Sequence, residues 1–309
     1  MIFFFSRGVK YQIINHRLYR DEGCLFPARC SGIEYFLNRI RNDIDNVELI
    51  INVRDWPQQS KYHSSESLPV FSFSKTQDYY DIMYPAWSFW DGGPAIKLYP
   101  RGLGQWDDHR KNLVKEATRI PWDKKLKKAF FRGSRTSNER DTLILLSRKN
   151  YSLVDAAYTK NQAWKSNKDT LGVPPVEELS LSEHCRYRYL FNFRGVAASF
   201  RFRHLFLCHS LVFHVGNEWQ EFFYEALKPW VHYIPIPPDA SEDTYRFLLR
   251  FFMEHDKLGF NIAKNGYDFV KTHLEIDDIL CYWKLLLKNY IKLQTFEPTL
   301  DKGLIDVTK

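Results

Sequence analysis

Short apolar runs alternate with amphipathic stretches along the whole chain of 309 residues. Strand-like runs separated by helical stretches are typical of βαβ units, which build parallel sheets with helices on their faces. The expected strands are 47–53, 69–73, 128–131, 154–156, 187–193, 210–215 and 232–236, and the expected helices are 31–41, 106–120, 137–148, 242–254, 258–273 and 277–293. The pattern therefore predicts an α/β fold.

The stretch Pro121-Trp-Asp-Lys-Lys125 separates two sets of these elements. A chain of this length fits two medium domains better than one large core. We predict two Rossmann-like domains, 1–120 and 121–296, facing across a cleft. The stretch 297–309 is expected to be a frayed tail.

The segment from Phe191 to Cys208 reads as a strand, a glycine turn and a helix that begins near Ser199. Small residues at the turn let a ligand approach the backbone, and unpaired helix N–H groups favour an anion. Arg194 and Arg201 add positive charge at the same place. The segment predicts either a cradle for a pyrophosphate or a basic helix capped by Ser199 and packed on a buried strand.

A second strand–turn–helix unit runs from Phe131 to Asp141 and again combines glycine, hydroxyl groups and arginines. Such a turn can hold an anion, although Ser137 and Arg140 also fit plain capping of a helix. Two similar turns together favour one bound diphosphate in the second domain.

The charge balance supports an anionic small ligand. Lys and Arg number 44 and Asp and Glu 37, which leaves +7, and no long run of one charge suggests a nucleic-acid tail. No segment is long and apolar enough for a membrane span. The five cysteines show no metal-binding spacing; they fit two disulfides and an unpaired residue in a secreted protein, or buried thiols in a cytosolic one.

Asp55 lies at the tip of the expected strand 47–53, next to Arg54 and Trp56. Open α/β sheets place their sites at the carboxyl ends of strands. An Asp desolvated against an aromatic wall is a better general base. The alternative interpretation is a structural Asp–Arg pair at a turn.

Several long motifs resemble those of the CAP10-type O-glucosyltransferases, glycosyltransferase family 90, and the resemblance covers nearly the whole chain. They are Asn52-Val-Arg-Asp55, Phe71-Ser-Phe-Ser-Lys75, Asp81-Ile-Met-Tyr-Pro-Ala-Trp87, Phe131-Arg-Gly-Ser-Arg-Thr-Ser137, Tyr158-Thr-Lys-Asn-Gln-Ala-Trp164 and Phe191-Asn-Phe-Arg-Gly-Val-Ala-Ala-Ser-Phe-Arg201. The resemblance implies a GT-B fold and an inverting transfer of a sugar from its UDP-sugar donor to serine. The sugar is glucose, with xylose as the alternative, and the serine lies in Cys-x-Ser-x-Pro/Ala-Cys of folded EGF-like repeats, as in Notch.

The resemblance also assigns roles to residues. It implies Asp55 as the general base, and disulfides Cys24–Cys30 and Cys185–Cys208. The implied donor-binding residues are Tyr99, Ser134, Arg140, Val196, Ala197, Ala198, Ser199, Phe200 and Arg201. The implied acceptor-binding residues are Ala95, Ile96, Lys97, Leu98, Tyr99 and Pro100. The resemblance implies that no metal ion or other cofactor is needed.

Two other functions share much of this sequence. A non-catalytic protein that binds UDP-sugars or EGF repeats would keep most motifs, whereas a phosphoryl transferase would need metal-binding carboxylates near a glycine loop, which we do not find. The family resemblance implies a monomer in the endoplasmic reticulum lumen. The family's signal peptide and retrieval signal are absent from this sequence, so we expect a truncated chain in which Cys281 lacks its partner.

Overall fold

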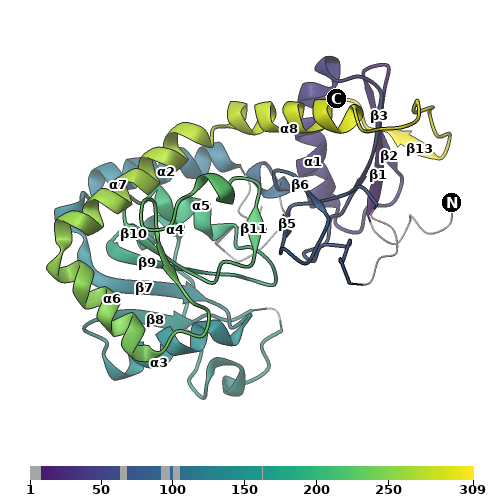
Figure 1. The fold of residues 1–309 in the computed structure, drawn as a ribbon. Helices are drawn as coiled ribbons and strands as arrows, with labels where there is room; N and C mark the ends of the chain where they lie inside the picture. The colour runs from purple at the N-terminus through teal and green to yellow at the C-terminus, as the bar shows by residue number, and fades with distance from the viewer. Residues whose placement is uncertain (1–7, 63–67, 92–97, 100–104, 162) are drawn as a thin grey trace. The chain divides into compact units, whose positions relative to one another are not determined.

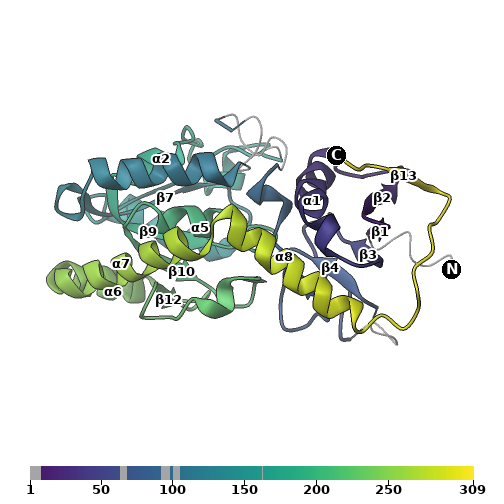
Figure 2. The same ribbon diagram turned by 90° about the horizontal axis from the view of Figure 1, so that it is seen from above.

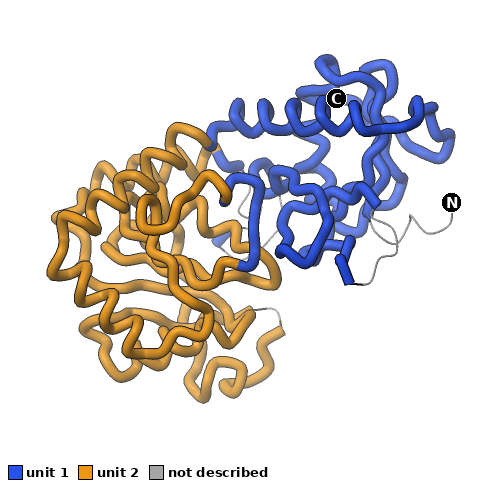
Figure 3. The backbone as a smooth tube through the Cα atoms, in the orientation of Figure 1, with its two compact units in different colours: residues 1–106, 218–224, 274–309 blue, residues 107–217, 225–273 orange. Residues whose placement is uncertain are grey.

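The structure is a computed structural model that describes residues 8–62, 68–91, 98–99, 105–161 and 163–309 (Figure 1). The chain forms two compact units (Figure 3). Unit 1 comprises residues 1–106, 218–224 and 274–309, and unit 2 comprises residues 107–217 and 225–273. The predicted α/β class with two units is confirmed, whereas the predicted cleft between domains stays a prediction.

The strands are β1 Val9–Ile14, β2 Arg17–Asp21, β3 Val47–Ile51, β4 Val70–Ser72, β5 Ser74–Lys75, β6 Ile82–Met83, β7 Leu126–Gly133, β8 Val154–Tyr158, β9 Tyr187–Phe193, β10 Leu211–Val215, β11 Gln220–Glu221, β12 Ile234–Ile236 and β13 Leu304–Asp306. The α-helices are α1 Pro27–Ile40, α2 Trp106–Arg119, α3 Asp141–Lys149, α4 Leu181–His184, α5 Arg201–Phe206, α6 Glu242–Glu254, α7 Asp256–His273 and α8 Ile276–Ile291. Short 3₁₀ turns are η2 Arg41–Asp43, η3 Trp87–Phe89, η4 Trp122–Lys124, η5 Asn138–Arg140, η6 Asn167–Thr170 and η7 Tyr224–Ala226.

Unit 2 contains a parallel sheet in the order β12-β10-β9-β7-β8. Alternate side chains of each strand point to opposite faces. On one face, Phe131 packs edge-to-face on Phe193, with 4.9 Å between ring centroids, in a core that includes side chains of α3, α6 and α7. On the other face, Phe130 contacts His184 of α4, and His214 stacks on Phe202 of α5. Figure 2 shows α2 and the pair α6–α7 on opposite sides of β7 and β9.

Unit 1 contains a mixed sheet in the order β13-β2-β1-β3-β4-β6. The pairs β3–β4 and β4–β6 are parallel, but β1 pairs antiparallel with both β2 and β3. The turn between β1 and β2 is Asn15-His16, and both residues have positive φ, 50° and 62°. The all-parallel sheet predicted for the first domain is therefore wrong, because this hairpin adds two antiparallel strands.

The C-terminal boundary of the predicted domains also differs from the structure. Helix α8 packs on α1 of unit 1, and Trp283 of α8 is fully buried with its ring 5.2 Å from that of Tyr84. Residues 274–296, assigned by the sequence to the second domain, thus belong to unit 1. At the boundary between the two predicted domains, residues 107–120, assigned by the sequence to the first domain, belong to unit 2.

The stretch 297–309 is not a frayed tail. Within it, β13 pairs antiparallel with β2, and Ile305 lies opposite Arg20. Arg17 forms an ion pair with Asp306, and the N–H of Val307 donates to the carbonyl of Leu18 at 2.9 Å. The tail is ordered because it completes the edge of the sheet in unit 1.

Candidate active site

The sheet of unit 2 has a topological switch point between β7 and β9. Counted along the chain, β7 is the first strand of this sheet, β8 the second, β9 the third, β10 the fourth and β12 the fifth. Across the sheet, the first strand therefore lies between the second and the third. In a doubly wound sheet of this order, ligands bind outside the carboxyl ends of the first and third strands. Those strands are β7, which ends at Gly133, and β9, which ends at Phe193. Both turns that the sequence predicted to hold a diphosphate therefore begin at this switch point.

Arg140 connects the two turns. Its Nη1 donates to the carbonyl of Ser134, and its Nη2 donates to the carbonyl of Arg194. The side chain is only 5% exposed, and its Nε has no hydrogen-bond partner among the residues that the structure describes. The bridge explains how two turns that are far apart in sequence keep a common geometry.

Arg201 lies beside Arg140. Its Nη1 donates to the carbonyl of Arg132 at 2.7 Å. The guanidinium groups of Arg140 and Arg201 each lie 5.5 Å from the centroid of the Phe131 ring. A Cβ at Gly133 would approach the Nη1 atoms of Arg201 and Arg140 to 3.2 and 3.5 Å, and Cζ of Phe131 to 2.8 Å. Glycine is thus required where the two cations converge.

The charge of Arg140 is poorly compensated. No carboxylate in the described residues forms an ion pair with it, whereas Arg194 pairs with Glu139 at 2.6 Å and Arg135 with Asp141 at 2.6 Å. Burial, and after it the charge of Arg201, lowers the pKa of Arg140 to about 9. A buried cation without a counter-ion is costly. The arrangement is therefore suited to an anion at the switch point.

The predicted donor segment 196–201 lies at this switch point too. The N–H of Gly195 donates to the carbonyl of Ala197 at 2.8 Å and closes a tight turn. Val196 is half exposed, while Ala197 and Ala198 are buried. The helix begins at Arg201 instead of near Ser199, has no side-chain cap and is six residues long, so a Ser-capped helix is not what this segment forms. Ser137 likewise makes no capping hydrogen bond.

A disulfide encloses β9, the turn and α5. Cys185 follows α4 and Cys208 follows α5, and the two are bonded, as are Cys24 and Cys30. Both predicted disulfides are thus confirmed. The buried ammonium of Lys125 donates to the carbonyls of Cys185 and Cys208 at 2.5 and 2.8 Å. This clamp fixes both ends of the segment that carries the second turn.

In unit 1, Asn52 organises the loop that follows β3. Its Nδ2 donates to the carbonyl of Trp56 at 2.8 Å and to Oγ of Ser72 at 2.9 Å, and its Oδ1 accepts the N–H of Arg54 at 2.9 Å. The fully buried carboxylate of Asp81 accepts from Ser72 and from the N–H groups of residues 58 and 59. These bonds connect the loop that carries Asp55 to Ser72 of β4 and to Asp81.

The side chain of Asp55 forms an ion pair with Arg29 of α1, with 3.0 Å between Oδ1 and Nη1. Arg29 is itself fixed by a hydrogen bond to the carbonyl of Val53 at 2.7 Å and by the ring of Trp87, 4.5 Å away. The side chain of Asp55 is 45% exposed, so the expected desolvation against an aromatic wall is wrong. The Asp–Arg pair of the alternative interpretation does form, but its partner is Arg29 and not Arg54.

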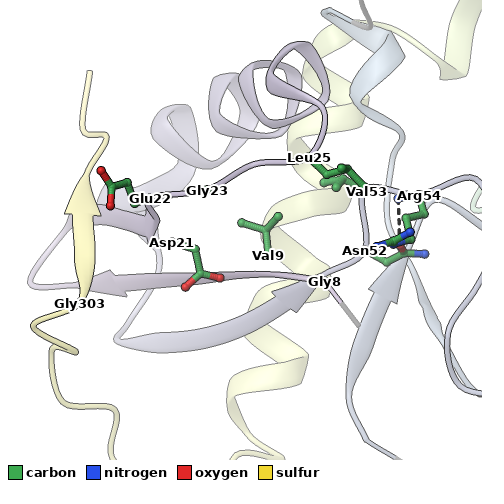
Figure 4. Close-up of a pocket in the computed structure, with 10 residues that line it drawn as sticks. All are labelled: Gly8, Val9, Asp21, Glu22, Gly23, Leu25, Asn52, Val53, Arg54 and Gly303. Atoms are coloured by element: carbon green, nitrogen blue, oxygen red, sulfur yellow. Dashed lines mark hydrogen bonds between the residues drawn. The ribbon is translucent and has the colours of Figure 1, made fainter. Parts of the chain in front are cut away.

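A cavity of about 340 Å³ borders the same motif (Figure 4). Its lining includes Asn52, Val53 and Arg54, together with Asp21 and Glu22 from the end of β2. Asp55 is not part of this lining. The backbone N–H of Lys10 donates to Asp21 at 2.6 Å.

The predicted acceptor loop is described only in part. Ala95, Ile96, Lys97 and Pro100 lie outside the described residues, so their predicted contacts are untested. Leu98 is 44% exposed and Tyr99 is half-buried, and both belong to unit 1. Tyr99 therefore lies in a different unit from Ser134, Arg140 and the segment 196–201.

Residues 5–309 match the family model described as glycosyl transferase family 90. The chain belongs to this family. The O-glucosyltransferase rumi homolog of Aedes aegypti is 59% identical over 98% of this chain and 75% of its own length. The O-glucosyltransferase rumi of Drosophila melanogaster is 58% identical over 96% of this chain and 73% of its own. A crystal structure of Anabaena Alr3699/HepE in complex with UDP-glucose aligns with 60% of this chain and 53% of its own at 11% identity and a TM-score of 0.41.

The structure gives roles to two residues that the sequence analysis did not assign to the site. Asp81 begins one of the quoted motifs, but its role in holding the loop around Asp55 becomes visible only in the structure. No sequence pattern indicated a role for Arg29, because its partner Asp55 is 26 positions further along the chain and the two meet only through folding. In the described part of this family 90 chain, no cluster of three or more His, Cys, Asp or Glu could hold a metal ion. None of the described helices has the length and apolar composition of a membrane span.

Proposed function

We propose that this family 90 protein is an inverting O-glucosyltransferase that transfers glucose from UDP-glucose to serine in EGF-like repeats. The observation that carries the proposal is the pair of guanidinium groups, Arg140 and Arg201, at the switch point of a doubly wound sheet. The names of the relatives at 58–59% identity, which are O-glucosyltransferases, support the reaction class. A Cys-x-Ser-x-Pro/Ala-Cys acceptor, as in Notch, is the acceptor that the family motifs favour.

The diphosphate of the donor would occupy the space between the turns after β7 and β9. Negative charge builds on UDP as the bond to glucose breaks, and fixed positive charge stabilises that developing charge. Arg140 still has an Nε–H to donate, and its burial strengthens any interaction with an anion. Because Arg140 and Arg201 supply this charge, we propose that transfer needs no metal ion.

Asp55 is the proposed general base. A serine hydroxyl attacks well only when a base takes its proton during the attack. Arg29 holds Oδ1 of Asp55, which leaves Oδ2 to accept that proton. Attack opposite the departing UDP inverts the anomeric carbon, so that α-linked glucose in the donor becomes β-linked in the product.

Asp55→Asn tests this role. The variant keeps the shape of the side chain and can still accept from Arg29, but it cannot take the proton. We expect transfer to an EGF-like repeat to fall below about 1% of wild type, since general-base catalysis contributes about 10²–10⁴-fold, while UDP affinity stays within about two-fold. Asp45→Asn, an exposed carboxylate of unit 1, is the matched control and should transfer normally.

A non-catalytic binding protein is the competing interpretation. It would bind UDP-glucose and an EGF-like repeat without releasing UDP, whereas a transferase releases one UDP for each glycosylated serine. An equal rate of UDP release with and without the repeat would contradict our proposal. Xylose lacks the hydroxymethyl group of glucose, and a pocket discriminates such a difference by only about 1–3 kcal/mol. A parallel assay with UDP-xylose measures how the rates of glucose and xylose transfer compare.

We further propose that the protein acts as a monomer in the endoplasmic reticulum lumen. Two disulfides support an oxidising compartment, because such bonds persist in secretory proteins and are rare in the cytosol. Localisation of a tagged chain by microscopy against a luminal marker would test the compartment, and a cytosolic signal would contradict it.

A further inference from the structure

The loop between α3 and β8 in unit 2 contains the triplet Asn150-Tyr-Ser152. It is the only place in the sequence where an asparagine is followed, after one residue other than proline, by serine or threonine. Such a triplet is the acceptor signal for N-linked glycosylation in secretory proteins. Triplets of this kind also occur by chance, so the geometry of the loop decides whether Asn150 can carry a glycan.

The side chains of the triplet lie on the surface of unit 2. Tyr151 is 62% exposed, Ser152 is exposed, and Asn150 is partly exposed directly after the last residue of α3. The apolar residues on either side, Leu146 and Leu153, are buried. The triplet is therefore presented to solvent by a segment that is anchored in the core at both ends.

Backbone hydrogen bonds fix the position of Asn150. Its N–H donates to the carbonyl of Leu146 at 2.9 Å, which continues the hydrogen bonding of α3 by one residue. Its carbonyl accepts the N–H groups of Leu153 and Val154, both at 3.1 Å. The turn from the helix into β8 is thus closed around Asn150 without any contribution from its side-chain nitrogen.

The side-chain amide of Asn150 uses only its oxygen within the loop. Oδ1 accepts from Oγ of Ser152 at 2.7 Å and from the N–H of Leu153 at 3.2 Å. A backbone N–H can only donate, so the atom that it reaches is the oxygen, and this settles the orientation of the amide. Nδ2 makes no hydrogen bond to any residue that the structure describes, in a side chain that is partly exposed.

A sugar on Nδ2 is compatible with these contacts. N-linkage turns the primary amide into a secondary amide, which keeps the oxygen as an acceptor and replaces one N–H by a bond to the sugar. Because the loop is held through Oδ1, the described hydrogen bonds of Asn150 can all persist in the modified chain. The folded structure therefore accommodates the linkage without rearrangement of the turn.

The triplet also lies at the opposite end of the sheet from the candidate active site. All strands of this sheet are parallel, and the switch point is at their carboxyl ends. Val154, at the amino end of β8, pairs with Ala129, and Tyr158 pairs with Gly133. At about 3.3 Å for each residue, the two ends of β8 are about 13 Å apart. A glycan on Asn150 therefore begins well away from Arg140.

We propose that Asn150 carries an N-linked glycan, an inference that rests on the proposed location in the endoplasmic reticulum lumen. A lipid-diphosphate-linked oligosaccharide supplies the sugar. The bond between Nδ2 and C1 of the first sugar forms while the bond between C1 and the diphosphate oxygen breaks. The diphosphate leaves with the electron pair of that bond, and Nδ2 loses one proton. Ser152 provides the hydroxyl that the acceptor signal requires.

Expression of the full chain in cultured eukaryotic cells, behind a signal peptide and with a C-terminal tag that contains its own acceptor triplet, tests this proposal. The glycan on the tag reports that the chain has entered the lumen, so the result does not depend on the chain's natural location. On treatment with peptide N-glycosidase, wild type should lose two glycans on a gel. Asn150→Gln and Ser152→Ala should each lose only the glycan of the tag.

Two matched variants control for the substitutions themselves. Ser152→Thr keeps the hydroxyl and should lose two glycans, as wild type does. Asn289→Gln changes an exposed asparagine of α8 that is followed two positions later by Ile291, so it should also lose two.

Mass spectrometry locates the glycan, because the glycosidase converts a modified asparagine to aspartate. Wild type should show this conversion at position 150, whereas an unconverted asparagine there in chains whose tag is glycosylated would overturn the proposal. Calorimetric titration with UDP should give the same affinity before and after the glycan is removed, and a difference would contradict its place away from the switch point. A chain that carries the glycan but transfers no glucose would count against the proposed function alone.

Discussion

Replacing Arg140 with methionine should separate ligand binding from stability. Burial lowers the pKa of Arg140 to about 9, which corresponds to roughly 5 kcal/mol of unfavourable environment for the charge. The substitution removes that charge but takes donors away from the carbonyls of Ser134 and Arg194. Hydrogen bonds from a charged group contribute about 1.5–3 kcal/mol each. The two effects nearly cancel, so the free energy of unfolding without ligand should change by less than about 2 kcal/mol.

Affinity for UDP should respond very differently. Losing one charge-assisted hydrogen bond of about 1.5–3 kcal/mol weakens binding by roughly 10- to 150-fold. Calorimetric titration with UDP measures this loss, and urea denaturation followed by tryptophan fluorescence measures the free energy of unfolding. The increase in melting temperature that saturating UDP gives wild type should be nearly absent in Arg140→Met.

Arg188 provides the matched control. It is also almost fully buried in unit 2, but it has a carboxylate partner, Asp256, at 2.5 Å and donates to the carbonyl of Trp122. Breaking a buried ion pair costs up to about 3–5 kcal/mol, and the partial exposure of Asp256 places the expected loss near the lower figure. Arg188→Met should therefore lose stability and keep UDP affinity. If Arg140→Met instead lost stability to the same extent and bound UDP normally, the reasoning about the switch point would be refuted.

Four further outcomes are expected. Gly133→Ala forces a Cβ to within 2.8 Å of Phe131 and should therefore lower the free energy of unfolding by about 1–3 kcal/mol. The same Cβ displaces Arg201, so UDP binding should weaken as well. Gly195→Ala, whose nearest neighbour would be 3.8 Å away, should leave stability unchanged by the same denaturation assay. Transfer should proceed at full rate in EDTA, and loss of activity that added Mg²⁺ or Mn²⁺ restores would contradict a metal-independent mechanism. Deleting residues 304–309 should lower the free energy of unfolding of unit 1, measured by urea denaturation, by about 1–3 kcal/mol. An unchanged urea midpoint would mean that β13 is dispensable.

The elements of unit 2 could be predicted from the sequence because local pattern and tertiary environment agree there. Strand β9 and helix α6 have the predicted bounds, since each is apolar or amphipathic over its whole length and is bounded by polar residues. The two glycine turns were also predicted, because each combines glycine with arginine just after a strand. Their convergence at one switch point needed the strand order, which no local pattern contains.

Unit 1 was harder to predict because its sheet depends on contacts between distant segments. The β1–β2 hairpin turns at Asn15-His16, where both residues have positive φ. Two-residue turns of this kind are usually recognised by Asn-Gly or Asp-Gly, so this hairpin lacks the usual sequence signal. Strand β13 is only three residues long, and its pairing with β2 is what makes it a strand.

The environment of Asp55 illustrates the limit of reading function from neighbours in sequence. Trp56 suggested an apolar wall, but this residue is 46% exposed and its Nε1 donates to the hydroxyl of Tyr79 at 2.6 Å. The group that faces Asp55 is Arg29, brought there by α1. The motif identified the carboxylate, and folding supplied the partner that orients it.

Mass spectrometry of a folded EGF-like repeat, incubated with UDP-glucose and the protein, tests the central claim most directly. Wild type should add one hexose to the serine of Cys-x-Ser-x-Pro/Ala-Cys and release one UDP for each hexose added. Asp55→Asn should leave the repeat unmodified while it still binds UDP. Addition of hexose by Asp55→Asn at a near-normal rate would contradict the assignment of the base, and an unmodified repeat with wild type would contradict the proposed reaction.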